Sequence, residues 1–305
     1  MDAAPPSGSA ISPTVALALG GGAARGLAHI AMLEAFDELG IRPQVIAGCS
    51  IGAIVGACYA AGLSAREIRA HLAPIVASRR AVARHVLRKL PGNVMKLWSP
   101  RHPTVVDGPT LLAMLLPEGV NTDFARLAIP LHLTAVDYRT MQPVVLSKGP
   151  VIPAVAASAS LPSLMRPVEI DGRVLFDGGF ANPTPFDIVM NDADITVAVD
   201  VTGRPDLRKP VASHSKEELW DGAFFALFTA VMREKLAQRA PDILLRPDVG
   251  LYRTLDFPKM DEIIAASAPE KRRLKQFLAE RVVGGGATQG NPSGVAAHQG
   301  TSSTI

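Results

Sequence analysis

The sequence contains very little cysteine: Cys49 and Cys58 are the only two in 305 residues. A disulfide framework is therefore not expected, and such sparse cysteine fits a reducing compartment. Residues 1–13 have neither the basic segment nor the apolar core of a signal peptide, and no uninterrupted apolar run is long enough to span a bilayer. We therefore expect a soluble, cytoplasmic protein.

A strong excess of charge is also missing, because the formal net charge is only +3. The molecule as a whole is therefore not a polycation directed at nucleic acid. A local absence is more informative, since no acidic residue occurs between Glu67 and Asp107. The basic residues in this gap, here called the basic stretch (residues 69–101), are Arg69, Arg79, Arg80, Arg84, Arg88, Lys89, Lys96 and Arg101. The stretch fits either a peripheral contact with an anionic membrane, to which each basic side chain adds about 1 kcal/mol, or a solvated insertion.

Short apolar runs alternate with helical patterns between residues 14 and 283. The runs at 14–19 and 43–47 predict the first two strands, and no repeat or linker divides the segment. We therefore predict one α/β domain over residues 14–283, a three-layer α/β/α fold with a mostly parallel central sheet. Residues 1–13 and 284–305 are rich in small and polar residues, which predicts disordered tails.

Local signals predict where several elements begin. Ser64-Ala65-Arg66-Glu67 and Ser215-Lys216-Glu217-Glu218 are capping boxes that open helices. Asp171-Gly172 predicts a type I′ hairpin turn. The long helix after Ser215, residues 217–238, is apolar enough to form an interface, but a core helix is the interpretation we favour.

The second predicted strand ends in Gly48-Cys49-Ser50-Ile51-Gly52, a G-x-S-x-G pattern between a strand and a helix. This is the setting of a nucleophile elbow, which exposes the serine Oγ above the end of the sheet. Side chains at Gly48 and Gly52 would crowd such a turn. The helix that follows also directs its positive end at the place where an oxyanion would form. An ordinary glycine-rich turn with an incidental serine fits the same pattern.

The first predicted strand ends in a glycine loop, Gly20-Gly21-Gly22-Ala23-Ala24-Arg25-Gly26. A dinucleotide-binding turn needs G-x-G-x-x-G and an acidic residue about 20 positions later. The glycine spacing fails, and no carboxylate occurs between Glu38 and Glu67, so this interpretation is disfavoured. The alternative is an oxyanion hole formed by backbone N–H groups of Gly21, Gly22 and Ala23, because adjacent parallel strands bring their carboxyl-terminal turns together.

Asp177 is the first candidate for the base that would activate Ser50. It follows an apolar strand and precedes Gly178 and Gly179, so it fits on a tight turn with little covering it. A partly desolvated carboxylate has a raised pKa and can take the serine proton directly. The alternative role is a turn-capping aspartate, which is common before glycine.

A Ser-His-Asp triad is the rival arrangement, with His214 as its histidine and Asp177 or Asp200 as its acid. His214 lies in a polar segment beside a helix cap, where a solvated loop histidine is expected. The elbow of a triad esterase also normally follows several strands, whereas Ser50 follows the second. No group of residues resembles a metal-ligand cluster.

The three blocks Leu19–Gly26, Gly48–Gly52 and Asp177–Gly179 together resemble the patatin-like phospholipases, and the bacterial subgroup most closely. Residues 157–167 and the continuation from Asp177 to Pro185 are also similar to that family, and the resemblance spans about residues 14–250. It implies a patatin-like fold and a serine acyl hydrolase of phospholipase A, lysophospholipase or esterase type. The substrate would be a phospholipid or another acyl ester, with no metal or organic cofactor required.

The resemblance also implies a role for each matched residue. Ser50 would be the nucleophile and Asp177 the base of a dyad without histidine. The backbone positions that would support it are Gly20, Gly21, Gly22 and Ala23 in the oxyanion hole, and Gly26, Gly48, Gly52, Gly178 and Gly179 in the motif turns. Ala23 departs from the family, which usually has glycine there, and Arg25 would face a lipid phosphate or the oxyanion, or pair with a structural carboxylate. A regulatory or lipid-binding member without activity is the remaining alternative.

Overall fold

The computed structural model describes residues 12–78, 80–81, 98–99, 102–162, 164–204 and 215–283. The tails predicted at 1–13 and 284–305 lie outside the described residues, except for residues 12 and 13. Most of the basic stretch lies outside them as well. Of its residues that are described, Arg69 forms an ion pair with Asp261 at 2.8 Å.

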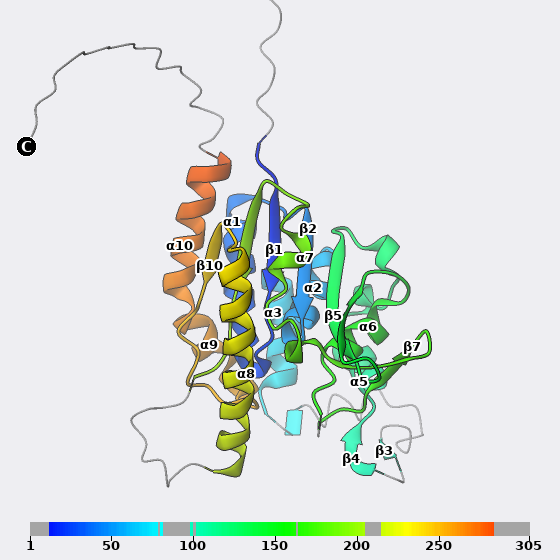
Figure 1. The fold of residues 1–305 in the computed structure, drawn as a ribbon. Helices are drawn as coiled ribbons and strands as arrows, with labels where there is room; N and C mark the ends of the chain where they lie inside the picture. Colours follow the sequence, from blue (N-terminus) through cyan, green and yellow to red (C-terminus); the bar gives the residue numbers. More distant parts are fainter. Residues whose placement is uncertain are drawn as a thin grey trace, which may run out of the picture.

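A mixed, mostly parallel sheet forms the centre of the described chain (Figure 1). Its eight strands within the described residues run in the order β10 (Ile243–Leu245), β9 (Ile195–Val199), β1 (Val15–Leu19), β2 (Val45–Cys49), β5 (Leu131–Asp137), β8 (Arg173–Asp177) and β7 (Val168–Ile170), with β6 (Gln142–Leu146) also paired to β5. Strands β10, β9, β1, β2 and β5 are parallel, whereas β6, β8 and β7 add antiparallel pairs. The central strands β1, β2 and β9 are buried along their whole length, which explains their unbroken apolar runs.

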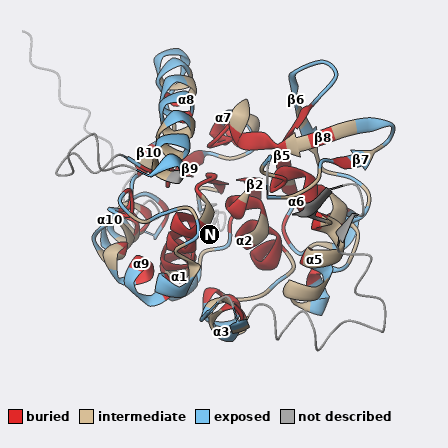
Figure 2. Ribbon diagram, turned by 90° about the horizontal axis from the view of Figure 1, so that it is seen from below, coloured by how far each residue is buried: buried red, intermediate tan, exposed pale blue. Residues whose placement is uncertain are grey.

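Helices lie on both sides of the sheet, as the end-on view of Figure 2 shows. One side carries α1 (Ala28–Leu39), α2 (Ile51–Ala60), α3 (Ala65–Val76), α5 (Gly108–Leu115), α6 (Val151–Ser158), α9 (Met260–Ala266) and α10 (Ala268–Leu278). The other side carries α7 (Phe186–Val189) and α8 (Lys216–Gln238). The predicted three-layer α/β/α fold is therefore confirmed. None of the helices in the described segments combines the length and apolar character needed to cross a bilayer.

The remaining elements are short. They are the two-stranded pair β3 (Trp98–Ser99) and β4 (His102–Val106), the 3₁₀ helices η1 (Ala23–Leu27), η3 (Glu118–Val120), η4 (Phe124–Arg126), η5 (Gly178–Phe180) and η7 (Phe257–Lys259), and the π-helical turn η8 (Ala279–Val283). Both predicted capping boxes form, at the starts of α3 and α8. Asp171 and Gly172 have φ values of 50° and 73°, as the predicted type I′ turn requires.

Helix α8 is not the core helix that its apolar sequence predicted. In its second half, buried Met232 packs with Ala16 and Ala18 of β1, and buried Phe228 packs against Phe180 of η5. In its first half, Leu219 and Trp220 are exposed. The reason is visible in Figure 1, where the first half of α8 extends past the end of the sheet and has no strand to cover it. The second half is anchored by Lys235, whose Nζ donates to the carbonyl oxygen of Thr184 at 2.8 Å.

Candidate active site

Ser50 lies on the turn between β2 and α2, with φ 53° and ψ −119°. Few residues with a Cβ adopt positive φ, so the turn holds the serine in a strained conformation. Glycine is required on both sides: a Cβ on Gly48 would lie 2.7 Å from the carbonyl oxygen of Gly52, and one on Gly52 would lie 2.1 Å from that of Leu19. The strand, turn and helix therefore have the geometry expected of a nucleophile elbow.

The register of the sheet sets the distance between Ser50 and Asp177. Cys49 pairs with Thr134 of β5, and the next residue of β5, Ala135, pairs with Asp177 of β8. Because Ser50 directly follows Cys49, the serine and the aspartate lie at the same level on either side of β5. Ser50 Oγ donates a hydrogen bond to Asp177 Oδ2 at 2.7 Å. The structure thus brings together the two side chains that the sequence suggested as a dyad.

The Asp177 carboxylate is only 3% exposed. Its Oδ1 accepts a hydrogen bond from the Gly179 N–H at 2.8 Å, and its Oδ2 accepts the bond from Ser50. Burial raises the pKa of Asp177 from its ordinary value to about 6, although both hydrogen bonds act in the opposite direction. A carboxylate whose pKa lies close to neutrality can both accept and return a proton at physiological pH.

Two backbone N–H groups of the glycine loop form hydrogen bonds that fix the loop to neighbouring segments of the chain. The Gly20 N–H donates to the carbonyl oxygen of Val199 at 2.9 Å, and the Gly21 N–H donates to that of Pro183 at 2.8 Å. The expectation that Gly20 and Gly21 supply oxyanion donors is therefore wrong, because β9 and the segment after Asp177 use these amides. The loop nevertheless passes beside the serine, since a Cβ on Gly21 would lie 3.3 Å from Ser50 Cβ.

The amides of Gly22 and Ala23 have no acceptor within the described part of the chain. Ala23 has a φ of 51°, a left-handed conformation that glycine adopts more readily. The methyl group at this position, the departure noted in the sequence, therefore leaves a glycine-like backbone in place. Gly22 and Ala23 both line the small cavity at Ser50.

Arg25 is buried beneath the loop rather than paired directly with a carboxylate. Its Nη1 donates to the carbonyl oxygen of Tyr252 at 2.7 Å, and its guanidinium carbon lies 4.5 Å from the centre of the Phe225 ring. Burial lowers the pKa of Arg25 to about 10, while Asp221 and Asp256 partly offset this through their charge. Its buried Nε has no partner among the described residues.

A small cavity of about 40 Å³ lies at Ser50 and Asp177, and a groove of about 660 Å³ adjoins it. The two share four lining residues: Leu161, Asp221, Phe224 and Thr254. The cavity is lined by Gly21, Gly22, Ala23, Arg25, Ser50, Leu161, Asp177, Asp221, Phe224, Phe225, Phe228 and Thr254. Helix α8 therefore forms one wall of the site.

Sequence reasoning missed several of these residues. Ser158 accepts the backbone N–H of Ser50 on its Oγ at 3.0 Å, although the segment around it was noted only as a family motif. Phe224, Phe225 and Phe228 come from α8, and Thr254 follows β10. Only the apolar character of α8 and the position of Thr254 after a parallel strand could have indicated them.

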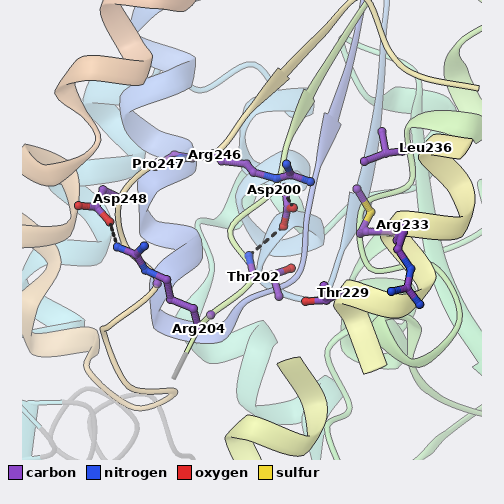
Figure 3. Close-up of a pocket in the computed structure, with 12 residues that line it drawn as sticks. Asp200, Thr202, Arg204, Thr229, Arg233, Leu236, Arg246, Pro247 and Asp248 are labelled. Carbon is purple, nitrogen blue, oxygen red and sulfur yellow. Dashed lines mark hydrogen bonds and ion pairs between the residues drawn. The ribbon is translucent and has the colours of Figure 1, made fainter. Parts of the chain in front are cut away.

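The other candidates of the sequence lie elsewhere. His214 lies outside the described residues, and Asp200 lines a separate pocket of about 520 Å³ (Figure 3). The Asp200 carboxylate accepts hydrogen bonds from the Thr202 N–H at 3.0 Å and Arg246 Nε at 3.1 Å. Of the described residues that line this pocket, none belongs to the Ser50 site.

His29 is a buried side chain that contacts the glycine loop. Burial lowers the pKa of His29 to about 4, so its neutral ring donates from Nε2 to the carbonyl oxygen of Gly20, 2.7 Å away, and supports the loop.

Cys49 and Cys58 are free and buried. Within the described segments, no three His, Cys, Asp or Glu side chains are grouped so that they could hold a metal ion.

Comparison with known proteins identifies the family. Residues 17–190, more than half of the chain, match the family model of the patatin-like phospholipases. The chain belongs to this family.

Individual relatives match over part of their length. An uncharacterized NTE family protein of Mycobacterium tuberculosis is 35% identical over 193 residues, which cover 63% of this chain and 50% of that protein. Lysophospholipase nte1 of Aspergillus fumigatus is 27% identical over 82% of this chain and 17% of its own length. The chain thus spans half or less of these relatives. The crystal structure of VipD from Legionella pneumophila overlaps 88% of this chain and 68% of its own, with 15% identity and a TM-score of 0.49.

Proposed function

We propose that this protein is a serine acyl hydrolase that cleaves lipid esters through a Ser50–Asp177 dyad. The observation that carries the proposal is the 2.7 Å hydrogen bond between Ser50 Oγ and Asp177 Oδ2, made at a strained strand–helix turn. Membership of the patatin-like phospholipase family and similarity to a lysophospholipase support an acyl ester of a lipid as the substrate. Residues 14–283 are proposed as the hydrolase unit.

In this mechanism, the ionised Asp177 accepts the hydroxyl proton while Ser50 Oγ attacks the ester carbonyl carbon. The tetrahedral intermediate collapses when Asp177 returns that proton to the leaving alcohol oxygen, which leaves an acyl group on Ser50. A water molecule then gives its proton to Asp177 and attacks the acyl carbon. When the second intermediate collapses, Asp177 returns this proton to Ser50 Oγ, which releases the fatty acid and restores the serine hydroxyl.

The oxyanion donors we propose are the backbone N–H groups of Gly22 and Ala23. Support comes from their lack of another acceptor in the described residues and from their place in the lining of the cavity. The start of α2 at Ser50 adds its positive helix end. Arg25, whose Nε has no partner among the described residues, is proposed to offer a further donor to an anionic oxygen of the substrate.

A fluorophosphonate probe and a soluble short-chain p-nitrophenyl ester test the proposal. The wild-type chain should bind the probe covalently and hydrolyse the ester, and Ser50→Ala should do neither. Ser267→Ala serves as the matched control and should keep both properties. It also removes a buried serine hydroxyl, one that donates to the carbonyl oxygen of Ile263. Absence of labelling in folded wild-type protein would instead support a lipid-binding protein without activity.

A further inference from the structure

We propose that the mouth of the Ser50 site is a membrane-docking face that inserts into a zwitterionic lipid surface. The proposal rests on the proposed function, because it assigns the route by which a lipid ester reaches the dyad. The face is made by four apolar side chains, here called the apolar rim: Leu164, Leu219, Trp220 and Leu255.

The residues of the apolar rim are strongly exposed although they are large and apolar. Leu164 is 41% exposed, Leu219 60%, Trp220 67% and Leu255 49%. They come from three segments that are distant in sequence: the loop after α6, the first half of α8 and the loop after β10. An exposed apolar patch assembled from separate segments marks a contact surface rather than a scattered set of surface residues.

The apolar rim borders the groove that leads to Ser50. Leu164, Trp220 and Leu255 line the groove of about 660 Å³, and Leu219 directly precedes Trp220 on α8 without lining the groove. The inner wall of the groove is shared with the cavity at the serine through Leu161, Asp221, Phe224 and Thr254. A rim seated in a bilayer would therefore open the groove toward the lipid. An acyl chain could pass from the bilayer to the dyad along the apolar side of the groove, past Leu161 and Phe224.

The charges around the groove favour a zwitterionic surface over an anionic one. Glu218 and Arg253 form an ion pair at 2.9 Å, and the Asp221 carboxylate accepts a hydrogen bond from Thr254 Oγ1 at 2.6 Å. The other carboxylate that lines it, on Asp256, is paired with Lys259 at 3.1 Å. Because the described residues of the groove carry no excess of basic side chains, apolar insertion and not attraction to anionic lipid must supply the binding.

Trp220 is expected to insert into the bilayer interface, and its fluorescence can be used to measure that insertion. Tryptophan is favoured where a bilayer meets water, because its ring is largely apolar and carries one polar N–H group. Its ring lies 6.2 Å from that of Phe224, which continues the apolar surface toward the site. The sequence contains two tryptophans, so Trp98→Phe leaves Trp220 as the single emitting one.

The first experiment uses the full chain with Trp98→Phe and Ser50→Ala, so that vesicles are not consumed. Vesicles of phosphatidylcholine should shift Trp220 emission to the blue, and brominated phosphatidylcholine should quench it. Binding should change little between about 50 mM and about 500 mM salt, a range over which screening would remove an electrostatic attraction. Emission that vesicles leave unchanged would overturn the proposal.

The second experiment compares matched variants by vesicle sedimentation. Trp220→Ser and Leu219→Ser should each lower partitioning by about tenfold, the loss expected when one large apolar side chain no longer leaves water. Val283→Ser is the control, because Val283 is 62% exposed and comes soon after α10 in the chain. The carboxyl-terminal end of α10 and the start of α8 lie at opposite ends of the molecule (Figure 1). The control should bind like the wild type, and Leu219→Ser and Val283→Ser should both hydrolyse a soluble ester normally.

Other occupants of the face give different results. Binding lost only when Arg79, Arg80, Arg84 and Arg88 are neutralised would assign the contact to the basic stretch. A blue shift that rises with protein concentration without vesicles would make the rim a contact between copies. Either result overturns the proposal. Failure of the proposed function is separate, because it would appear as no hydrolysis of the soluble ester while vesicle binding persists.

Discussion

The backbone N–H of Ser50 donates to the side-chain oxygen of Ser158, at the end of α6, over 3.0 Å. Ser158 is completely buried, so its hydroxyl is a fixed support for the turn. We predict that Ser158→Ala lowers the free energy of unfolding by about 1–3 kcal/mol, because it leaves a buried amide without a partner. It should also lower kcat, since the turn loses the contact that orients the serine.

Urea denaturation and hydrolysis of a soluble ester measure the two effects of Ser158→Ala. Ser267→Ala is the comparison, because it removes another buried hydroxyl, one that bonds to the carbonyl oxygen of Ile263 at 2.8 Å. That variant should lose stability without a change in kcat. An unchanged kcat in Ser158→Ala would show that the turn is oriented without this contact.

The pH dependence should follow the ionisation of Asp177. With a pKa of about 6, the carboxylate is mostly ionised above that pH and available as a base. We predict that kcat/KM for a soluble ester falls about tenfold per unit as pH drops below about 6, and that Asp177→Asn lowers it by roughly 10²–10⁴ at pH 8. A flat profile between pH 5 and pH 8 would remove Asp177 from the role of base.

The same group should make the folded state less stable as the pH rises. A carboxyl group whose pKa is raised by folding binds more protons in the folded chain than in the unfolded chain. Its contribution is therefore lost as pH increases from its ordinary value of 3.8 to about 6. We predict that Asp177→Asn raises the free energy of unfolding at pH 8 by about 1 kcal/mol or more, measured in urea, and that the gain disappears near pH 4. If Asp177→Asn and wild type differed in free energy of unfolding by the same amount at pH 8 and pH 4, the raised pKa of Asp177 would be contradicted.

Ala23 offers a test of strain in the glycine loop. Its φ of 51° costs about 1 kcal/mol for a residue with a Cβ, and glycine avoids this cost. Ala23→Gly should therefore stabilise the protein by about that amount in thermal or urea denaturation while keeping its activity, because the N–H is retained. Ala24→Gly, at a buried neighbour without positive φ, should destabilise it instead.

The dyad and the triad differ in their dependence on His214. We predict that His214→Ala leaves kcat and KM for a soluble ester within about twofold of wild type, because Asp177 already contacts Ser50 Oγ at 2.7 Å as a candidate base. Loss of the general base itself would cost roughly 10²–10⁴-fold. Circular dichroism of the variant verifies that it is folded. Loss of activity in a folded His214→Ala protein would require a triad.

Much of the fold follows from local patterns. The unbroken apolar runs of β1 and β2, the capping boxes at Ser64 and Ser215 and the turn at Asp171 each depend on nearby residues, and the structure has all of them. The serine turn is local as well, because Gly48 and Gly52 are required by backbone atoms close to it in the structure.

What could not be predicted depends on distant partners. The Gly21 N–H was expected to face the substrate, but Pro183, 162 positions later, accepts it. Arg25 is held by Tyr252, on a segment that no motif linked to the loop. The exposed half of α8 was missed because its apolar residues are spread around the helix, so the pattern does not mark the side that packs.

The nucleophile follows a strand in the interior of the sheet, whereas the base lies on a strand next to its edge. Ser50 and the glycine loop follow β2 and β1 in its interior, whereas Asp177 is carried by β8, which pairs with three residues of β5 and with the short strand β7 at the edge. Opening of the β7–β8 hairpin would withdraw the base while the serine and the loop stay in place. Heating should therefore inactivate the protein reversibly before its core melts, and the edge of the sheet would set its working temperature.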